Sequence, residues 1–209
     1  MTRRGAFIVF EGGEGVGKST QVGLLVAHLH ATRPELRIVQ SREPGGTPAA
    51  EALRRVALDK DFVGLAPRAE ALVFAAARGD HVYQVIRPAL EQGACVIVDR
   101  YIDSSVVYQG LARGLGADEV ERLSMWATES LLPDLVILLD LDPRSGLERI
   151  TAPDRLESEG LEFHVAVREG FLARAAAHPD RFAVIDASAS VDVVAAAVAA
   201  AVDRVLDER

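Results

Sequence analysis

The chain has 209 residues, of which 49% are hydrophobic and 26% charged, proportions typical of a soluble globular protein. Its formal net charge of −8 argues against general nucleic-acid binding, which needs a basic surface. The one cysteine, Cys95, lies in an apolar run and excludes a disulfide framework within the chain. The longest apolar segment, residues 191–202, is broken by Asp192 and is too short to span a bilayer. No signal-peptide pattern precedes the first apolar run, so a cytoplasmic protein with a single domain, residues 1–209, is predicted.

Short apolar runs alternate with helical patterns along the whole chain. The apolar runs cover residues 7–10, 37–39, 94–98, 135–139 and 182–185. Each is short and almost continuously apolar, which predicts strands that are buried on both faces. The helical patterns cover residues 17–31, 47–58, 67–92, 103–111, 117–131, 143–150, 160–177 and 191–206. The alternation predicts an α/β fold with three layers (αβα), in which helices cover both faces of a five-stranded parallel sheet.

The first apolar run leads into a glycine-rich loop, EGGEGVGKST, which opens the first helical pattern. Gly12, Gly17, Lys18 and Ser19 match the phosphate-binding P-loop pattern G-x-x-x-x-G-K-[ST]. Glycines let successive backbone N–H groups point at a phosphate near the positive end of the helix. Lys18 can reach the β- and γ-phosphate oxygens, and the Ser19 hydroxyl can bind Mg²⁺. The predicted ATP-binding residues are Gly12, Gly13, Glu14, Gly15, Val16, Gly17, Lys18, Ser19 and Thr20.

Every predicted strand is followed by glycine, serine or charged residues, in the segments EGGEGVGKS, SREPGGT, DRY, DLDPRSG and DASAS. Ligands of open α/β sheets bind outside the carboxyl ends of the strands, so these segments predict one crevice. Asp99 ends the third strand and is expected to serve Mg²⁺, directly or through a water molecule. The alternative for Asp99 is a cap on the next helix. Arg100 suits a phosphate clamp, because its guanidinium group forms bidentate hydrogen bonds.

Several segments, taken together, resemble bacterial thymidylate kinases. In chain order they are EGGEGVGKST, REPGGT, LVFAAARGDHV, DRYIDSSVVYQG and DRLESEGLEFH, and the resemblance covers roughly residues 7–172. This combination is far more selective than a P-loop alone. The resemblance implies a P-loop NTPase fold with a short lid near residues 148–160. It also implies a homodimeric enzyme that transfers the γ-phosphoryl group of MgATP to dTMP, giving dTDP in dTTP synthesis.

The resemblance also assigns the residues that would bind dTMP. Glu14 would contact the sugar 3′-hydroxyl, a partner that explains a carboxylate among phosphate-binding groups. Phe74 would stack on thymine, while Arg78, one helical turn further on, would bond a base oxygen and help to hold the monophosphate. Ser105 would bond the thymine edge, and the Tyr108 ring would crowd the 2′ position and disfavour ribonucleotides. The predicted substrate-binding residues are Glu14, Arg42, Phe74, Arg78, Arg100, Ser105, Tyr108 and Gln109, with Gln109 placed behind the direct contacts.

Phosphoryl transfer depends on positioning and on cations around the γ-phosphoryl group, so no protein nucleophile is expected. The variable P-loop positions 13–16 contain no arginine, and the lid must therefore supply one. Arg149 and Arg155 are the candidates in the lid. Arg155, in the segment DRLE, matches the family better, but the lid is short and the choice between them stays open. The predicted catalytic residues are Lys18, Arg100, Arg155 and Arg149.

The remaining polar positions leave alternatives open. The predicted metal-binding residues are Ser19, Asp99 and Glu157, and for Glu157 the alternative is a solvated lid residue. Arg54 or Arg55 would complete the clamp on the acceptor phosphate, or both are surface arginines.

The segment DASAS lies where members of this family cradle adenine, largely through backbone groups. The histidines, which include His81 and His164, show no ligand spacing. They are expected at the surface or in the packing rather than at a metal.

Two other functions remain as alternatives. One is a different nucleotide or deoxynucleoside kinase on the same scaffold, although Arg78, Arg100 and REPGGT favour a monophosphate acceptor. The other is a nucleotide-dependent switch. The chain has no asparagine and therefore lacks the guanine-reading N-K-x-D motif of an ordinary GTPase. It also lacks the second lysine early in the P-loop that a partitioning ATPase would need.

Overall fold

The computed structural model describes residues 4–209, so residues 1–3 of the predicted domain lie outside the described part. Within it, five strands form one sheet in the order β2-β3-β1-β4-β5. All neighbouring strands are parallel, which confirms the predicted parallel sheet. The strands are β1 Phe7–Glu11, β2 Ile38–Arg42, β3 Cys95–Asp99, β4 Leu135–Asp140 and β5 Phe182–Asp186.

Every strand continues beyond its apolar run and ends on a charged residue. These last residues are Glu11, Arg42, Asp99, Asp140 and Asp186. The hydrogen bonds of the ladder join backbone groups, so a charged side chain at the strand end does not interrupt them. The prediction of strands buried on both faces is wrong for β2 and β5, which lie at the sheet edges and are partly exposed. Charged groups therefore collect at the carboxyl edge of the sheet.

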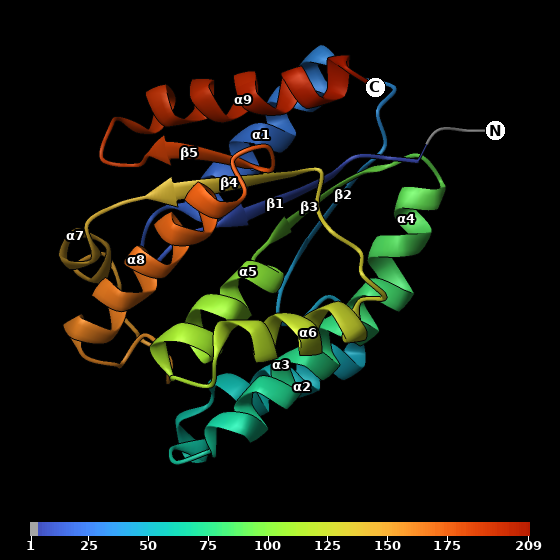
Figure 1. Cartoon of the computed structure of the whole chain (residues 1–209). Coiled ribbons are helices and arrows are strands. Elements are labelled where there is room, and N and C mark those ends of the chain that lie inside the picture. The colour runs from blue at the N-terminus through green and yellow to red at the C-terminus, as the bar shows by residue number, and fades with distance from the viewer. Residues whose placement is uncertain (1–3) are drawn as a thin grey trace.

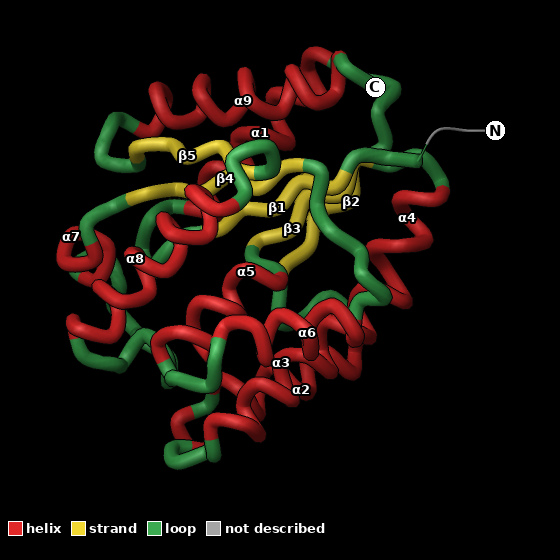
Figure 2. The backbone as a smooth tube through the Cα atoms, in the orientation of Figure 1, coloured by secondary structure: helices red, strands yellow, loops and turns green. Residues whose placement is uncertain are grey.

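Helices cover both faces of the sheet, as predicted (Figures 1 and 2). On one face α1 Lys18–Thr32 and α9 Val191–Asp207 pack beside each other. Side chains alternate along each strand, and in β1 Ile8 and Phe10 join the core cluster under these two helices. Phe7 and Val9 point to the opposite face, into a second core cluster. Cys95, predicted in the core, is fully buried.

The opposite face carries most of the remaining helices, which are α2 Pro48–Leu58, α3 Pro67–His81, α4 Arg87–Glu91, α5 Ile102–Ser105, α6 Ala117–Ala127 and α8 Leu161–Ala177. A short helix, α7 Pro143–Leu147, lies beyond the carboxyl ends of the strands (Figure 1). A 3₁₀ turn, η1 Lys60–Phe62, follows α2. Within residues 4–209, no helix meets the length and hydropathy that a membrane crossing requires.

The helical segments differ from their predictions at specific points. The predicted helix 67–92 is divided by a π-helical turn, η2 Val82–Ile86, just before Pro88, which has no backbone N–H to donate. A second π-helical turn, η3 Val106–Ala112, extends the predicted helix 103–111. Helix α6 ends early because Glu129 and Ser130 adopt left-handed backbone angles.

Candidate active site

Two adjoining cavities lie at the carboxyl ends of the strands. The larger has a volume of about 650 Å³ and is lined by residues 14–21, which belong to the glycine-rich loop and the start of α1. The smaller has a volume of about 110 Å³, and Phe74 and Tyr108 are among the side chains that line it. The residues common to both cavities are Glu14, Glu43, Arg54, Arg100 and Glu157. Loops from distant parts of the chain thus build one crevice, as predicted.

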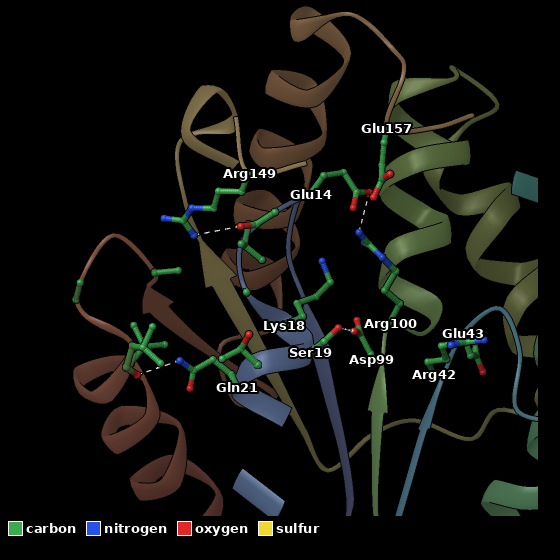
Figure 3. A pocket seen from close by; sticks show the side chains of 18 of the residues that line it. Glu14, Lys18, Ser19, Gln21, Arg42, Glu43, Asp99, Arg100, Arg149 and Glu157 are labelled. Atoms are coloured by element: carbon green, nitrogen blue, oxygen red, sulfur yellow. Dashed lines mark hydrogen bonds and ion pairs between the residues drawn. The ribbon is translucent and has the colours of Figure 1, made fainter. Parts of the chain in front are cut away.

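The glycine-rich loop joins β1 to α1 and is pressed against α7. Gly15 has a φ of 65°, and a Cβ atom added to it would overlap the carbonyl oxygen of Gly146 in α7. The Lys18 Nζ donates to the carbonyl oxygens of Gly12 and Gly13, at 3.1 and 2.6 Å. Burial and the neighbouring Arg100 charge lower the pKa of Lys18. Figure 3 shows its ammonium group beside the cavity.

The predicted phosphate-binding residues divide into two groups. Residues 14–20 line the larger cavity, whereas Gly12 and Gly13 line small hollows behind the loop. The carbonyl oxygens of these two glycines accept hydrogen bonds from charged side chains instead. Both accept from Lys18, and that of Gly12 also accepts from Arg100 at 3.1 Å.

Ser19 and Asp99 form a pair at the floor of the larger cavity (Figure 3). The Ser19 hydroxyl donates to Asp99 Oδ2 at 3.2 Å. The other carboxylate oxygen, Oδ1, is buried and has no hydrogen-bond partner among residues 4–209. In this part of the chain no three His, Cys, Asp or Glu side chains gather as a metal cluster. One free carboxylate oxygen and one hydroxyl fit Mg²⁺, which takes most of its other ligands from phosphate and water.

Glu157, predicted to assist a metal ion, borders both cavities. Its carboxylate accepts from the backbone N–H of Asp154 at 2.8 Å. Burial raises the pKa of Glu157. The side chain is therefore held by the lid backbone and borders the site without contacting Ser19 or Asp99 directly.

Arg100 and Glu14 form an ion pair between the two cavities, 2.7 Å apart (Figure 3). Arg100 has a φ of 70°, and its guanidinium group lies 5.2 Å from the centre of the Tyr108 ring. The Tyr108 hydroxyl donates to the same Glu14 oxygen at 2.7 Å. Burial alone would raise the pKa of Glu14, but Arg100 and Lys18 lower it to about 2. Glu14 is therefore a carboxylate at physiological pH and accepts hydrogen bonds only.

The smaller cavity brings together six of the predicted substrate-binding residues, namely Glu14, Phe74, Arg100, Ser105, Tyr108 and Gln109. Arg78 is not among the residues that line it. The Arg78 side chain is fully buried behind the wall, where it donates to Ser105 Oγ at 2.9 Å and pairs with Glu43 at 2.7 Å. Arg78 therefore does not reach the surface of this cavity. It acts on the cavity wall through its hydrogen bond to Ser105.

Comparison with known proteins decides which family this geometry belongs to. A family model described as thymidylate kinase matches residues 10–198. The chain belongs to the thymidylate kinase family. A thymidylate kinase of Bifidobacterium longum (strain DJO10A) is 52% identical over 198 residues, which cover 93% of this chain and 95% of the relative. One of Clavibacter sepedonicus is 50% identical over 200 residues, 94% of this chain and 93% of the relative.

A solved structure of this family has the same architecture. The thymidylate kinase of Ehrlichia chaffeensis aligns with a TM-score of 0.79 at 32% sequence identity, and the alignment covers 96% of this chain and 99% of that one. The P-loop fold of thymidylate kinases thus extends over nearly the whole chain.

In this thymidylate kinase family member, the two predicted lid arginines make different contacts, and only Arg149 lines a cavity. Arg149 lines the larger cavity and donates to the carbonyl oxygen of Gly15 at 3.2 Å (Figure 3). Arg155 is 8% exposed and lines neither cavity. Its guanidinium group pairs with Glu70 at 2.7 Å and donates to the carbonyl oxygen of Ala57. In this structure buried hydrogen-bond partners hold Arg155 away from the larger cavity, and its part in phosphoryl transfer stays a prediction.

The arginines at the end of β2 and in α2 differ in whether they line a cavity. Arg42 lines the larger cavity and pairs with Glu51 at 3.1 Å. Arg54 borders both cavities and donates to the carbonyl oxygen of Pro44 at 2.9 Å. Arg55 is exposed and lines neither cavity. Of the open pair, the structure brings Arg54 to the site and leaves Arg55 at the surface.

The loop after β5 reaches the larger cavity, where Ala187 and Ala189 line it. Gln21 donates to the carbonyl oxygen of Val191 at 3.0 Å and joins this loop to α1 (Figure 3). The two histidines discussed above, His81 and His164, are both buried, with 0% and 3% exposure. The surface alternative is therefore wrong for them, and the packing alternative holds.

Sequence patterns did not point to Glu11, which the fold places beneath Arg100. Its carboxylate accepts from the backbone N–H groups of Tyr101 and Ser104, at 2.9 and 3.0 Å. Ser104 in turn accepts from Arg100 at 3.2 Å. Burial, reinforced by the charge of Asp103, raises the pKa of Glu11 to about 7. The available signal was a charged residue at the end of an otherwise apolar strand.

Proposed function

We propose that the chain is a thymidylate kinase, which transfers the γ-phosphoryl group of ATP to dTMP in dTTP synthesis. Membership of the thymidylate kinase family over residues 10–198 carries this proposal. The pair of adjoining cavities supports it. The larger, bordered by the P-loop, has room for ATP, and the smaller has an aromatic wall at Phe74 suited to a flat base.

The donor side rests on the P-loop. Its backbone N–H groups and Lys18 hold the phosphates, while the alanines after β5 line the end of the cavity that receives adenine. Ser19 and Asp99 would hold Mg²⁺, with Glu157 as an assisting residue. Mg²⁺, when bound, neutralises charge on the phosphate oxygens. The buried and unpaired oxygen of Asp99 supports this assignment.

The acceptor side rests on the smaller cavity. Phe74 stacks on thymine, Ser105 bonds the base edge with Arg78 behind it, and Tyr108 crowds the 2′ position of the sugar. Glu14 accepts a hydrogen bond from the 3′-hydroxyl, which its ionised state suits. The clamp on the acceptor phosphate consists of Arg42, Arg54 and Arg100.

The transfer itself needs alignment and positive charge. An oxygen of the dTMP phosphate attacks the γ-phosphorus, and a new P–O bond forms while the bond to the β-phosphate oxygen breaks. The electron pair of the broken bond leaves with ADP. Lys18, Arg100 and Arg149 neutralise the charge that develops on the transferred group. Arg149 is chosen over Arg155 because it lines the larger cavity.

Other properties stay predictions, among them a single domain, a lid near residues 148–160, a cytoplasmic location and a homodimer. The exposed apolar residues Leu72, Tyr83 and Trp126 support the homodimer, since they lie on the neighbouring elements α3, η2 and α6. Sedimentation of the purified protein measures this oligomeric state.

An acceptor panel tests the proposed activity. The purified protein is assayed for ADP formation with MgATP and each of dTMP, dUMP, UMP, AMP and thymidine. We expect dTMP to give the highest kcat/KM, and the Lys18→Ala variant to provide the background rate with an unchanged unfolding transition. Absence of dTMP-dependent ADP formation would remove the proposal. A preference for another acceptor would instead favour a different kinase on this scaffold.

A further inference from the structure

A buried carboxylate, Glu70 in α3, lies between the lid and the smaller cavity, which is called the acceptor cavity below. It is 1% exposed. One of its oxygens accepts from the Gln109 amide at 2.9 Å. The other pairs with Arg155 at 2.7 Å, and Arg113 lies 3.7 Å from the first. One anion therefore contacts three groups that come from η3, the segment after it and the lid.

On the lid side, Glu70 belongs to a larger set of contacts that fixes residues 155–159. The Arg155 backbone N–H donates to the carbonyl oxygen of Leu58 at 3.1 Å, and its side chain donates to the carbonyl oxygen of Ala57. Leu156 is buried in a core cluster that includes Phe74. This half of the lid is docked on α2 and α3.

The first half of the lid is held differently. Arg149 is exposed, and among residues 4–209 its side chain makes one hydrogen bond, to the P-loop carbonyl of Gly15. The lid therefore has a buried end, secured by Glu70, and an exposed end beside the phosphate cavity. The contacts that order the buried end therefore also fix one end of the lid segment that carries Arg149.

On the acceptor side, Glu70 holds the amide of Gln109, which lines the smaller cavity. A carboxylate only accepts hydrogen bonds, so it selects the Nε2 end of the amide and fixes its orientation. Loss of the Glu70 charge would free this amide. It would also leave the buried Arg155 guanidinium group without its anionic partner, which is costly in a dry environment.

We propose that Glu70 is a positioning residue that orders the acceptor cavity and the buried end of the lid together. The proposal rests on the proposed function in one respect, namely that dTMP occupies the smaller cavity. Glu70 itself lines neither cavity. It acts through Gln109 on one side and Arg155 on the other.

The Glu70→Gln variant tests this role because it keeps the shape of the side chain and removes its charge. We expect dTMP alone, measured by calorimetry without ATP, to bind about tenfold more weakly than to the wild type. We also expect faster hydrogen exchange at the backbone amides of residues 155–159, with ATP affinity unchanged. Glu119→Gln is the matched control, since Glu119 pairs with Arg122 at the surface, and it should change none of these quantities.

A second variant, Arg155→Met, keeps the proposal testable if Glu70→Gln fails to fold. Arg155→Met keeps Glu70 paired with Gln109 and Arg113, so it should speed exchange in the lid while changing dTMP affinity less than Glu70→Gln does. Wild-type exchange and wild-type dTMP affinity in Glu70→Gln would overturn the proposal. Failure of the wild type itself to bind dTMP would count against the proposed function, whereas the exchange comparison would still test Glu70.

Discussion

Single side chains in the crevice combine separable roles, and Tyr108 is the clearest case. Its hydroxyl donates to Glu14 at 2.7 Å, while its ring is buried in the wall of the smaller cavity. The hydroxyl contacts a carboxylate, and we propose that the ring limits the space available to the sugar. The two effects can be separated by two substitutions at one position.

Tyr108→Phe removes the hydroxyl alone, and Tyr108→Ala removes the ring as well. We expect the Phe variant to bind dTMP more weakly but to keep the preference for the deoxynucleotide, because the ring still fills the 2′ space. The Ala variant should lose much of that preference. The measurement is kcat/KM for dTMP and for ribothymidine 5′-monophosphate. Equal loss of preference in both variants would assign discrimination to the hydroxyl instead.

Glu11 gives a prediction about pH. Its pKa is raised from 4.5 to about 7, by burial first and by Asp103 second. The folded state therefore binds the Glu11 proton more tightly than the unfolded state does. The stability contributed by this proton is complete below pH 4.5 and is lost as the pH rises to about 7.

The Glu11→Gln variant removes this titration and keeps an oxygen for the N–H groups of Tyr101 and Ser104. Relative to the wild type, it should gain stability between about pH 5 and about pH 7.5, by an amount on the order of 3 kcal/mol or less. Urea unfolding at both pH values measures the difference. A difference between the two proteins that does not change with pH would contradict the assigned titration.

At the scale of elements, α7 is tied to the P-loop by backbone contact. Cβ atoms added at Gly15 or Gly146 would overlap the backbone of the other segment. Only glycines allow this approach, and the lid begins directly after α7. The distance between the P-loop and the lid is therefore set by two residues without side chains.

Gly146→Ala should force α7 and the P-loop apart. We expect kcat/KM for both substrates to fall by about 10²-fold, because a shift of about 1 Å at reacting groups has that effect. Gly23→Ala is the control: this exposed glycine of α1 has nothing within 4 Å of an added Cβ. It should leave activity unchanged and stabilise the helix by about 1 kcal/mol. Normal activity in Gly146→Ala would show that α7 can move away from the P-loop without disturbing the active site.

Arg149→Ala tests the exposed end of the lid. If Arg149 neutralises the transferred group, kcat should fall by about 10³-fold or more, while KM for dTMP changes little. Arg144→Ala, an exposed arginine of α7 that lines neither cavity, is the matched control. Single-turnover measurements separate transfer from product release. A variant Arg155→Ala that loses more transfer rate than Arg149→Ala would reverse the assignment.

At the scale of the whole molecule, buried ion pairs join helices far apart in the chain. Arg174 in α8 pairs with Asp103 in α5 at 2.7 Å and with Glu121 in α6 at 2.8 Å. Asp103 is fully buried and also lies 3.3 Å from Arg181. These charges connect α8, the helix that follows the lid, to α5 and α6.

Arg174→Met should destabilise the fold by about 3–5 kcal/mol, because it leaves the buried charge of Asp103 with only the longer ion pair to Arg181, at 3.3 Å. Arg122→Ala removes an exposed ion pair with Glu119 and should cost about 1 kcal/mol or less. Urea unfolding curves compare the two variants. Similar losses in both would mean that solvent reaches Asp103 and screens its charge.

Much of the site could be predicted from the sequence, because the signals involved are local. The P-loop spacing, the apolar strands and the polar residues that follow them lie in short stretches of chain. Parallel strands bring their carboxyl ends to one edge, so Lys18, Asp99 and Arg100 converge whatever the details of packing. The strand pattern therefore determined the fold class and the place of the crevice.

Only the tertiary structure decided which buried charges meet. The family resemblance assigns Arg78 to the base and makes Arg155 a candidate for the γ-phosphoryl group. In the structure, Glu43 and Glu70, distant in the sequence, pair with these guanidinium groups, and neither arginine lines a cavity. An arginine side chain is long and flexible, so its direction depends on the nearest anion, and that anion is brought by another element. The local sequence pattern determines where the backbone of a residue lies. The packing of distant elements determines which partner its charged side chain contacts.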